Sequence, residues 1–257
     1  MSSSSSDRFQ WLEWPGREFP FLDGVPARFS GLQWLLVMAM VAAGFLAVAL
    51  PIPWPGGAVG KVIPAVLMPA LPLLGVHLVA RGQWRVLFGT FSWREAKLVL
   101  LFAVLNIAVS VCVGLTVKSF VEVQANPAIA LLANASTADA LWFFAKTLPQ
   151  LLGEEVVTVL PFLAFMVLLS RYGGAHRKTA IVGAWLLSAL MFGLMHLPTY
   201  GWNVVQCVVI IGTARLVLTL PWIMTKNLWV STGAHILNDW TMFGVAMLAT
   251  TAQGAAR

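Results

Sequence analysis

Seven long apolar runs constrain this chain more than any other feature of its sequence. They lie at approximately 31–50, 60–80, 97–117, 148–170, 179–197, 203–223 and 228–249. Each is close in length to the roughly 20 apolar residues that an α-helix needs to cross the hydrocarbon core of a bilayer. In lipid, a helix satisfies its backbone hydrogen bonds internally. The sequence therefore predicts an all-α fold, a polytopic transmembrane helical bundle with about seven spans.

The scarcity of charge agrees with that architecture. Only 10% of the 257 residues are charged, 59% are hydrophobic, and the mean hydropathy is +0.83. A soluble domain usually has about 25% charged residues to cover its surface. We therefore expect an integral membrane protein in contact with the lipid bilayer, without a separate soluble catalytic module.

The basic residues indicate an orientation and exclude one class of partner. The chain has 16 Lys and Arg against 10 Asp and Glu, a net charge of +6. These bases lie between the apolar runs and form no basic patch of the kind that a nucleic-acid surface requires. An N-terminus in the cytoplasm places most of them on the inner side, as the positive-inside rule demands. The inner bases are then Arg8, Arg17, Arg28, Arg81, Arg85, Arg94, Lys97, Arg171, Arg177, Lys178 and Lys226, and the outer ones Lys61, Lys118, Lys146 and Arg257.

The runs and the segments between them divide the chain into four parts. Residues 1–30 are rich in Trp, Phe and Pro and lack a helical period, which suits an N-terminal interfacial arm. Residues 31–120 hold the first three expected spans. Residues 121–147 form a polar loop or a surface helix. Residues 148–250 hold the last four spans, where we expect the catalytic core.

Ionisable side chains inside the expected spans point to that core. Each costs about 2.5–3.5 kcal/mol to insert, so such residues are functional candidates by default. Six of the seven lie in the last four spans, and only one lies earlier. In chain order they are His77, Glu154, Glu155, His196, Arg215, His235 and Asp239. The chemistry is therefore expected within residues 148–240.

Glu154 and Glu155 are neighbours within an apolar helix. Adjacent helical residues point about 100° apart, so the two carboxylates cannot both face the same point. One can meet a reacting group while the other has a supporting role. A carboxylate in a low-dielectric site is suited to act as a general base on water. The alternative is a pair of structural acids, neutral or ion-paired.

A second constellation lies in the last expected span. Asn238 and Asp239 follow His235 by three and four residues, so all three share one face of a helix. They can orient one another and a ligand, or they can form an interhelical hydrogen-bond cluster. His196 ends the fifth apolar run just before Pro198. Taken alone, a histidine at a helix end is more typical of the membrane interface than of a catalytic site.

These residues together resemble the CAAX-protease and bacteriocin-processing (CPBP, or Abi) family of intramembrane peptidases. The family pattern is Glu-Glu-x-x-x-Arg, then Phe-x-x-x-His, then His-x-x-x-Asn/Asp on successive core helices. In this sequence the matching positions are Glu154-Glu155, Phe192 to His196, and His235 with Asp239. The resemblance covers roughly residues 145–245 and implies an intramembrane protease at a bacterial inner (plasma) membrane.

One position departs from that pattern. The family arginine should fall at position 159, where this sequence has Val159. Arg215 lies inside the sixth run and can supply the missing charge from another helix. Alternatively, Arg215 forms a structural ion pair with Asp239.

The resemblance also implies roles for the site residues. Glu154 or Glu155 would activate water as general base, and His196 would lie next to the attacked carbonyl. His235 with Asp239 or Asn238 would position water or stabilise the oxyanion. A metal is left open: the glutamate mechanism requires none, whereas Glu155, His196 and His235 would be the ligands if zinc is present, as the name metalloprotease often used for this family implies.

Substrate and function classes also stay open. The substrate would be a peptide or protein at the membrane, either a CAAX-like prenylated C-terminal segment or a leader peptide, as in bacteriocin processing. A different class is a non-proteolytic immunity or scaffold protein that retains the fold, which Val159 favours. A small transporter is a third class, but the halves of the chain show no inverted similarity.

The expected boundaries raise a problem of depth. At ~1.5 Å per residue, Glu155 and His196 lie roughly 22–24 Å from the inner ends of their spans, and His235 only about 10 Å from its own. A shared site therefore requires that the last helix is broken, is displaced or starts away from the membrane surface.

Overall fold

The computed structural model describes residues 7–22, 24–133 and 135–255, and this part of the chain contains helices and no strand. The long helices are α1 (Gly31–Ala49), α3 (Ile63–Val79), α4 (Trp93–Lys118), α6 (Thr137–Val167), α7 (Arg177–Met195), α8 (Gly212–Thr225) and α9 (Leu228–Ala255). Short helical segments are α2 (Gly57–Gly60), η2 (Gln83–Leu87), α5 (Pro127–Ala133), η3 (Leu168–Tyr172) and η4 (Gln206–Ile211). The all-α polytopic bundle is confirmed, and a long helix overlaps each of the seven apolar runs.

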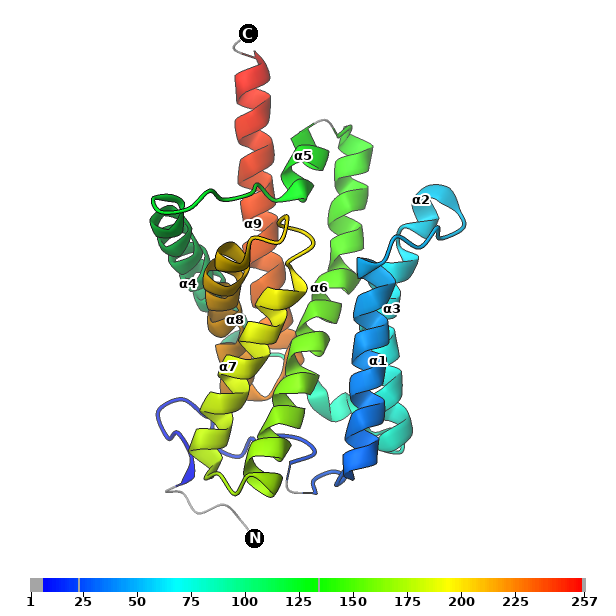
Figure 1. The fold of residues 1–257 in the computed structure, drawn as a ribbon, viewed down its shortest axis with the longest axis vertical. Coiled ribbons are helices and arrows are strands. Elements are labelled where there is room, and N and C mark those ends of the chain that lie inside the picture. Colours follow the sequence, from blue (N-terminus) through cyan, green and yellow to red (C-terminus); the bar gives the residue numbers. More distant parts are fainter. Residues whose placement is uncertain (1–6, 23, 134, 256–257) are drawn as a thin grey trace.

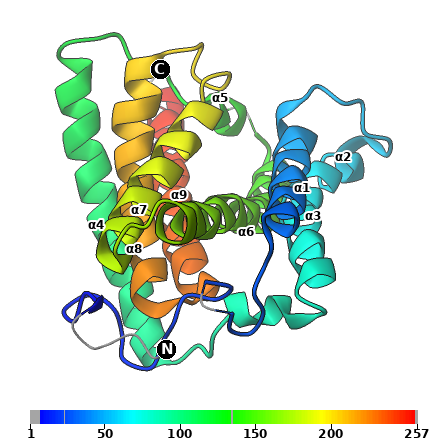
Figure 2. The same cartoon turned by 60° about the horizontal axis from the view of Figure 1, so that its bottom comes forward.

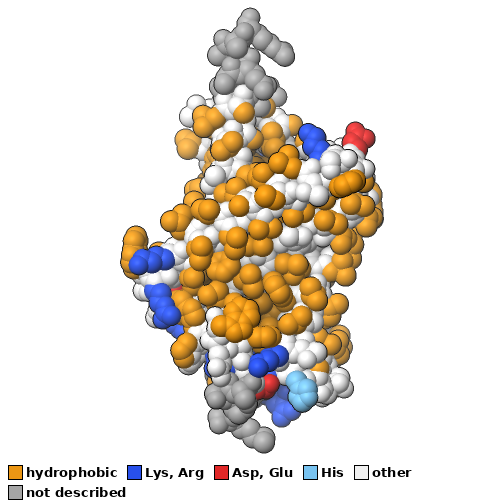
Figure 3. Space-filling model, turned by 90° about the vertical axis from the view of Figure 1, so that its left-hand side faces the viewer, with side chains coloured by type: hydrophobic (Ala, Val, Ile, Leu, Met, Phe, Trp, Pro, Cys, Tyr) orange, Lys and Arg blue, Asp and Glu red, His pale blue; other side chains and the backbone are white. Residues whose placement is uncertain are grey.

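Five helical stretches of the described chain are long and apolar enough to cross a membrane: Gly31–Ala49, Trp93–Lys118, Thr137–Tyr172, Arg177–Met195 and Gln206–Thr225. The remaining two long helices differ for separate reasons. α3 has only 17 residues, and the polar residues of the expected site lower the hydropathy of α9. Leucines are frequent on the outside of the bundle, and Figure 3 shows apolar side chains over most of one face, with charged ones at its margins: the upper right, the left edge and the bottom.

α6 is the central helix of the bundle. α1 and α3 pack on one side of it, and α7 and α9 pack on the other (Figures 1 and 2). It is also the most buried of the five candidate spans. Gly153 allows α3 to approach closely, since a Cβ atom there would lie 2.6 Å from the Met68 side chain. The close packing of α3 therefore falls on the turn of α6 that carries Glu154 and Glu155.

α6 begins well before the apolar run that predicted it. Ser136 caps it, because its hydroxyl accepts a hydrogen bond from the backbone N–H of Asp139. The helix then continues from Thr137, and the segment assigned to a polar loop or surface helix is divided between α5 and the first turns of α6.

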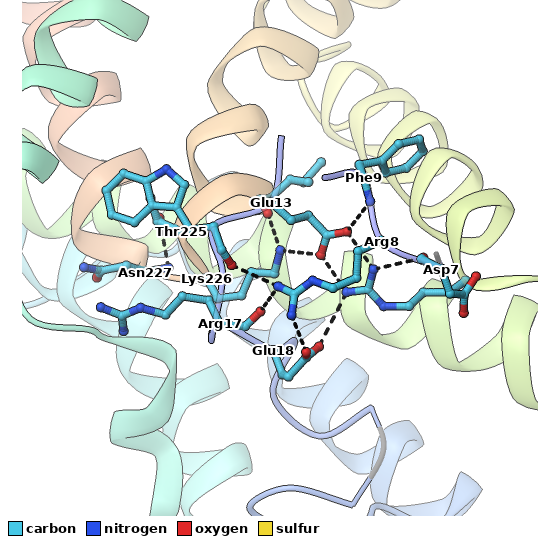
Figure 4. Close-up of polar contacts among 12 residues, drawn as sticks. Asp7, Arg8, Phe9, Glu13, Arg17, Glu18, Thr225, Lys226 and Asn227 are labelled. Carbon is cyan, nitrogen blue, oxygen red and sulfur yellow. Dashed lines mark hydrogen bonds and ion pairs between the residues drawn. The ribbon is translucent and has the colours of Figure 1, made fainter. Parts of the chain in front are cut away.

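The N-terminal arm folds beneath one end of the bundle and packs into it. Phe19 and Phe21 are buried in the core. The Glu13 carboxylate is buried, accepts two hydrogen bonds of 2.6 Å from the Arg177 guanidinium and lies 2.9 Å from Lys226 Nζ. Burial raises the pKa of Glu13, but Arg177 and Lys226 outweigh it and lower the pKa to about 2. Figure 4 shows Glu13 beside Lys226, within the larger group of charges that the arm contributes.

This arm resolves the problem of depth. The turn between α8 and α9 is buried, and Asn227 fixes it by donating to the Thr90 carbonyl and accepting from Gly89 N–H, both at 2.9 Å. The backbone N–H of Trp14 also donates to the Met224 carbonyl, at 3.0 Å. α9 therefore starts above the lower ends of α6 and α7, with the arm below it (Figure 1). His235 reaches Glu155 although it lies only seven residues into its helix.

Candidate functional site

The two carboxylates of α6 leave the helix in different directions. Glu155 faces the interior and is 1% exposed, whereas the Glu154 side chain is 13% exposed. Glu154 Oε1 accepts a hydrogen bond of 3.3 Å from Gln150 Nε2, one helical turn earlier. This divergence follows from the ~100° rotation between neighbouring helical residues. The two glutamates therefore have different surroundings and can have different roles.

His235 lies between the two carboxylates. Its Nδ1 is 2.9 Å from Glu155 Oε1, and its Nε2 is 3.8 Å from Glu154 Oε2. The same Nε2 is 3.7 Å from Asp239 Oδ1, one turn further along α9. The same Nδ1 also lies 3.3 Å from Arg215 Nη2, so it has one acceptor and one donor as neighbours. A proton on Nδ1 makes the shorter contact a hydrogen bond to the Glu155 carboxylate, which can only accept. The Nε2 atom therefore points to a space shared by two further carboxylates, at distances too long for direct hydrogen bonds.

Arg215 neutralises Glu155 from α8. Its Nη1 donates to Glu155 Oε1, and both side chains are 1% exposed. Its guanidinium also lies 3.8 Å from the centre of the Phe192 ring, in a cation–π contact. Glu155, not Asp239, is the ion-pair partner that the structure gives Arg215 within the described residues. Arg215 thus provides the charge that the family pattern places at Val159, which is buried in the core.

The polar face of α9 is held by a residue that the sequence analysis missed. Asn238 Nδ2 donates to Asp239 Oδ1 at 2.8 Å, and Asn238 Oδ1 accepts from Asn106 Nδ2 at 3.0 Å. Asn106 is buried on α4. The sequence signal for Asn106 is an amide within an otherwise apolar run, which the insertion cost of ionisable groups does not highlight. The chain Asn106, Asn238, Asp239 orients the carboxylate that faces His235.

His196 lies near the cluster of Glu154, Glu155, His235 and Asp239 but not within hydrogen-bonding contact of it. It follows the last residue of α7, and its Nδ1 is 2.9 Å from the Phe192 carbonyl oxygen. Its ring centroid lies 4.6 Å from that of Phe192, whose face meets Arg215. No hydrogen bond or ion pair recorded for the described residues joins His196 to Glu154, Glu155 or His235. The structure therefore brings together Glu154, Glu155, His235, Asn238 and Asp239. His196 is linked to this group through the Phe192 ring, which contacts Arg215.

Tyr200 is a second residue that the sequence analysis missed. It is 7% exposed, its ring stacks on His196 with centroids 6.4 Å apart, and its hydroxyl accepts a hydrogen bond of 3.3 Å from Asn126 Nδ2. Burial raises the pKa of Tyr200 to about 12, with further contributions from Asp239 and Glu154. The phenol therefore lies within the field of both carboxylates. The spacing of four residues from Phe192 to His196 and on to Tyr200 was the available signal.

The arrangement does not fit the zinc ligand set Glu155, His196 and His235. Among the described residues, no group of three His, Cys, Asp or Glu side chains is arranged to hold a metal ion. The Glu155 oxygen that would bind zinc already accepts from Arg215 and His235. A cation placed there would meet the guanidinium, and His196 is turned to the Phe192 carbonyl. We therefore derive no step through a metal.

Comparison with protein-family models identifies a related family. Residues 136–241 match a family model described as Rce1-like, type II CAAX prenyl endopeptidase. This segment runs from the N-cap of α6 into α9 and contains every site residue named above except Asn106 and Asn126. The match confirms the resemblance to the CPBP intramembrane peptidases. No curated protein and no solved structure matches the chain.

Proposed function

We propose that this chain, with its Rce1-like segment at residues 136–241, is an intramembrane endopeptidase that hydrolyses a peptide bond in a membrane-associated peptide by a glutamate-activated water. The observation that carries the proposal is the His235 imidazole between the buried carboxylate of Glu155, which Arg215 neutralises, and the partly exposed carboxylate of Glu154. Uncompensated charges inside a membrane are costly, so a polar cluster of this density is best explained by chemistry.

The contacts support different roles for the two glutamates. Glu155 Oε1 accepts from both Arg215 and His235, so this carboxylate orients the imidazole and is not free to take a proton. Glu154 is partly exposed and faces His235 Nε2 across 3.8 Å. Polar atoms at such a separation can share a bridging water. We therefore assign Glu154 as the general base, with His235 and Asp239 holding the water.

The reaction then proceeds in two balanced steps. The water oxygen bonds to the carbonyl carbon while one of its protons passes to Glu154, which leaves a tetrahedral oxyanion. On collapse the carbon–nitrogen bond breaks, and the amine takes the proton back from Glu154. The products are a carboxylic acid and an amine, and the carboxylate of Glu154 is restored.

The family match favours a CAAX-like C-terminal segment as the substrate, and a leader peptide is the other candidate. The argument for a non-proteolytic protein rested on Val159, and Arg215 now supplies a charge to Glu155 instead. The distribution of Lys and Arg supports a cytoplasmic N-terminus. A bacterial inner membrane is proposed from the family resemblance alone.

Cleavage of defined peptides tests the proposal. The purified protein in liposomes would receive a fluorogenic prenylated CAAX peptide or a leader-type peptide. We expect Glu154→Gln and His235→Ala to abolish cleavage of whichever peptide is cut. The matched controls Glu122→Gln and His77→Ala alter exposed residues and should cleave as the wild type does. Cleavage by Glu154→Gln at the wild-type rate would overturn the assignment of the base.

A further inference from the structure

We propose that Tyr200 is a further catalytic residue, whose phenol donates a hydrogen bond to the substrate carbonyl oxygen as it becomes an oxyanion. This inference rests on the proposed peptidase function. It follows from the donors and acceptors that the described residues offer around Glu154 and from the place of Tyr200 among them.

The site is rich in acceptors and poor in donors. Glu154 and Asp239 are carboxylates, and the amide group of Asn238 already donates to Asp239. Arg215 is committed to Glu155 and to the Phe192 face. An oxyanion gains stabilisation only from groups that donate hydrogen bonds toward it. In the neutral ring of His235 a proton on Nδ1 is used in the bond to Glu155, so Nε2 is an acceptor. A further donor from outside this group would therefore stabilise the oxyanion.

His196 does not supply this donor in its neutral form. Its Nδ1 lies 2.9 Å from the Phe192 carbonyl, and a carbonyl can only accept, so Nδ1 carries the proton. The other ring nitrogen of a neutral imidazole is then an acceptor. His196 thus lines the site without donating a hydrogen bond. Tyr200 stacks on the His196 ring and adds an O–H group beside it.

The phenol is held in a way that leaves its proton available. Asn126 donates to the phenolic oxygen, so this bond does not use the Tyr200 proton. Asn126 is itself fixed, because its side-chain oxygen accepts from the backbone N–H of Ala128 at 2.9 Å. No hydrogen bond recorded for the described residues has the Tyr200 hydroxyl as its donor. A pKa of about 12 keeps the group protonated throughout the neutral range.

The backbone around Tyr200 is also tied down. Its N–H donates to the His196 carbonyl at 3.2 Å, and the chain then turns through the left-handed conformations of Gly201 and Trp202. From the other side, Gln206 exchanges hydrogen bonds of 2.8 and 2.9 Å with the backbone of Gln124. The phenol is therefore preorganised between two segments, as an oxyanion donor must be.

Kinetics of Tyr200→Phe test the inference, with Tyr172→Phe as the matched control. Tyr172 is the only other tyrosine and is exposed. Removal of one oxyanion donor lowers kcat by about 100- to 1000-fold. We expect this loss for Tyr200→Phe, a KM within about threefold of the wild type, and no change for Tyr172→Phe.

A second measurement separates catalysis from packing. A peptidyl aldehyde, whose hydrate resembles the tetrahedral intermediate, should bind Tyr200→Phe more weakly by about the factor lost in kcat. The uncleaved peptide should bind Glu154→Gln and Glu154→Gln/Tyr200→Phe equally well. A merely structural role for Tyr200 would weaken both ligands alike and would overturn the inference.

The two proposals fail in distinguishable ways. If the wild type cleaves and Glu154→Gln does not, but Tyr200→Phe keeps its kcat within threefold, the inference about Tyr200 is wrong and the peptidase stands. If the wild type cleaves neither peptide, the peptidase proposal fails, and the role of Tyr200 in it fails as well.

Discussion

The buried pair of Arg215 and Glu155 makes a quantitative prediction about stability. Both side chains are 1% exposed, so removing one partner leaves the other charge without compensation in the core. Such a change costs about 3–5 kcal/mol. We expect this cost for Arg215→Gln and for Glu155→Gln, which corresponds to a fall in Tm of about 6–20 °C at this chain length.

The double variant should lose less free energy of unfolding than the sum of the losses in the two single variants. In Arg215→Gln/Glu155→Gln neither partner leaves an unpaired charge. Only the loss of the contacts with Phe192 and His235 still lowers the free energy of unfolding. A coupling energy of about 3 kcal/mol is the upper part of the range for residues in direct contact. Arg28→Gln, at an exposed residue, is the control and should leave Tm unchanged.

A thiol-reactive dye can follow the unfolding in detergent. Cys207 is buried next to α8, whereas Cys112 is exposed and would react at once. A Cys112→Ala background therefore leaves one thiol that reports unfolding near the site. Strict additivity of the two single variants would refute the reasoning, since an interacting pair must show coupling in the cycle. Arg215 would then have no energetic link to Glu155.

Three further outcomes are expected. Glu13→Gln should destabilise the protein at neutral pH by about 3–5 kcal/mol, because Arg177 and Lys226 lose their buried partner. The pKa of Glu13 falls from 4.5 to about 2 on folding, so its stabilisation is complete above pH 4.5 and is lost as the pH falls toward 2. Tm measured against pH should therefore converge for wild type and Glu13→Gln at low pH. Asn106→Leu should leave an Asn238 acceptor unpaired and cost about 1–3 kcal/mol, together with a lower kcat in the peptide assay. Chelator treatment should leave cleavage intact, and elemental analysis showing stoichiometric zinc whose removal abolishes cleavage would contradict the metal-free mechanism.

Several parts of the site were predictable because the membrane makes them conspicuous. Glu154, Glu155 and His235 interrupt apolar runs, where each ionisable group carries a large insertion cost. The period of the helix then predicted that the two glutamates diverge and that Asp239 lies beside His235. These inferences need only the local geometry of one helix, which hydropathy already indicates.

Relations between helices were harder to predict. Arg215 had acidic candidates on two helices, the pair Glu154 and Glu155 and also Asp239, and only the rotation of α8 against α6 and α9 decides between them. Tyr200 lies in a connection between helices, where polar side chains are inexpensive and therefore not conspicuous. The role proposed for Tyr200 depends on its hydrogen bond with Asn126, 74 residues earlier, which no local pattern reveals.

The depth of His235 shows how a distant segment controls the site. An estimate from hydropathy counts depth from the nearest polar turn. For α9 this turn is Lys226 and Asn227, which the estimate treats as lying at the membrane surface. In the structure these polar groups are buried, because Glu13 binds Lys226 and the backbone at Gly89 and Thr90 binds Asn227. A turn with protein partners need not reach water, so α9 can start about 12–14 Å inside, which is the difference between the depth of Glu155 and His196 and the depth counted for His235 at ~1.5 Å per residue. The arm and the Gly89–Thr90 segment together hold the turn that precedes α9, although none of these residues belongs to the candidate site.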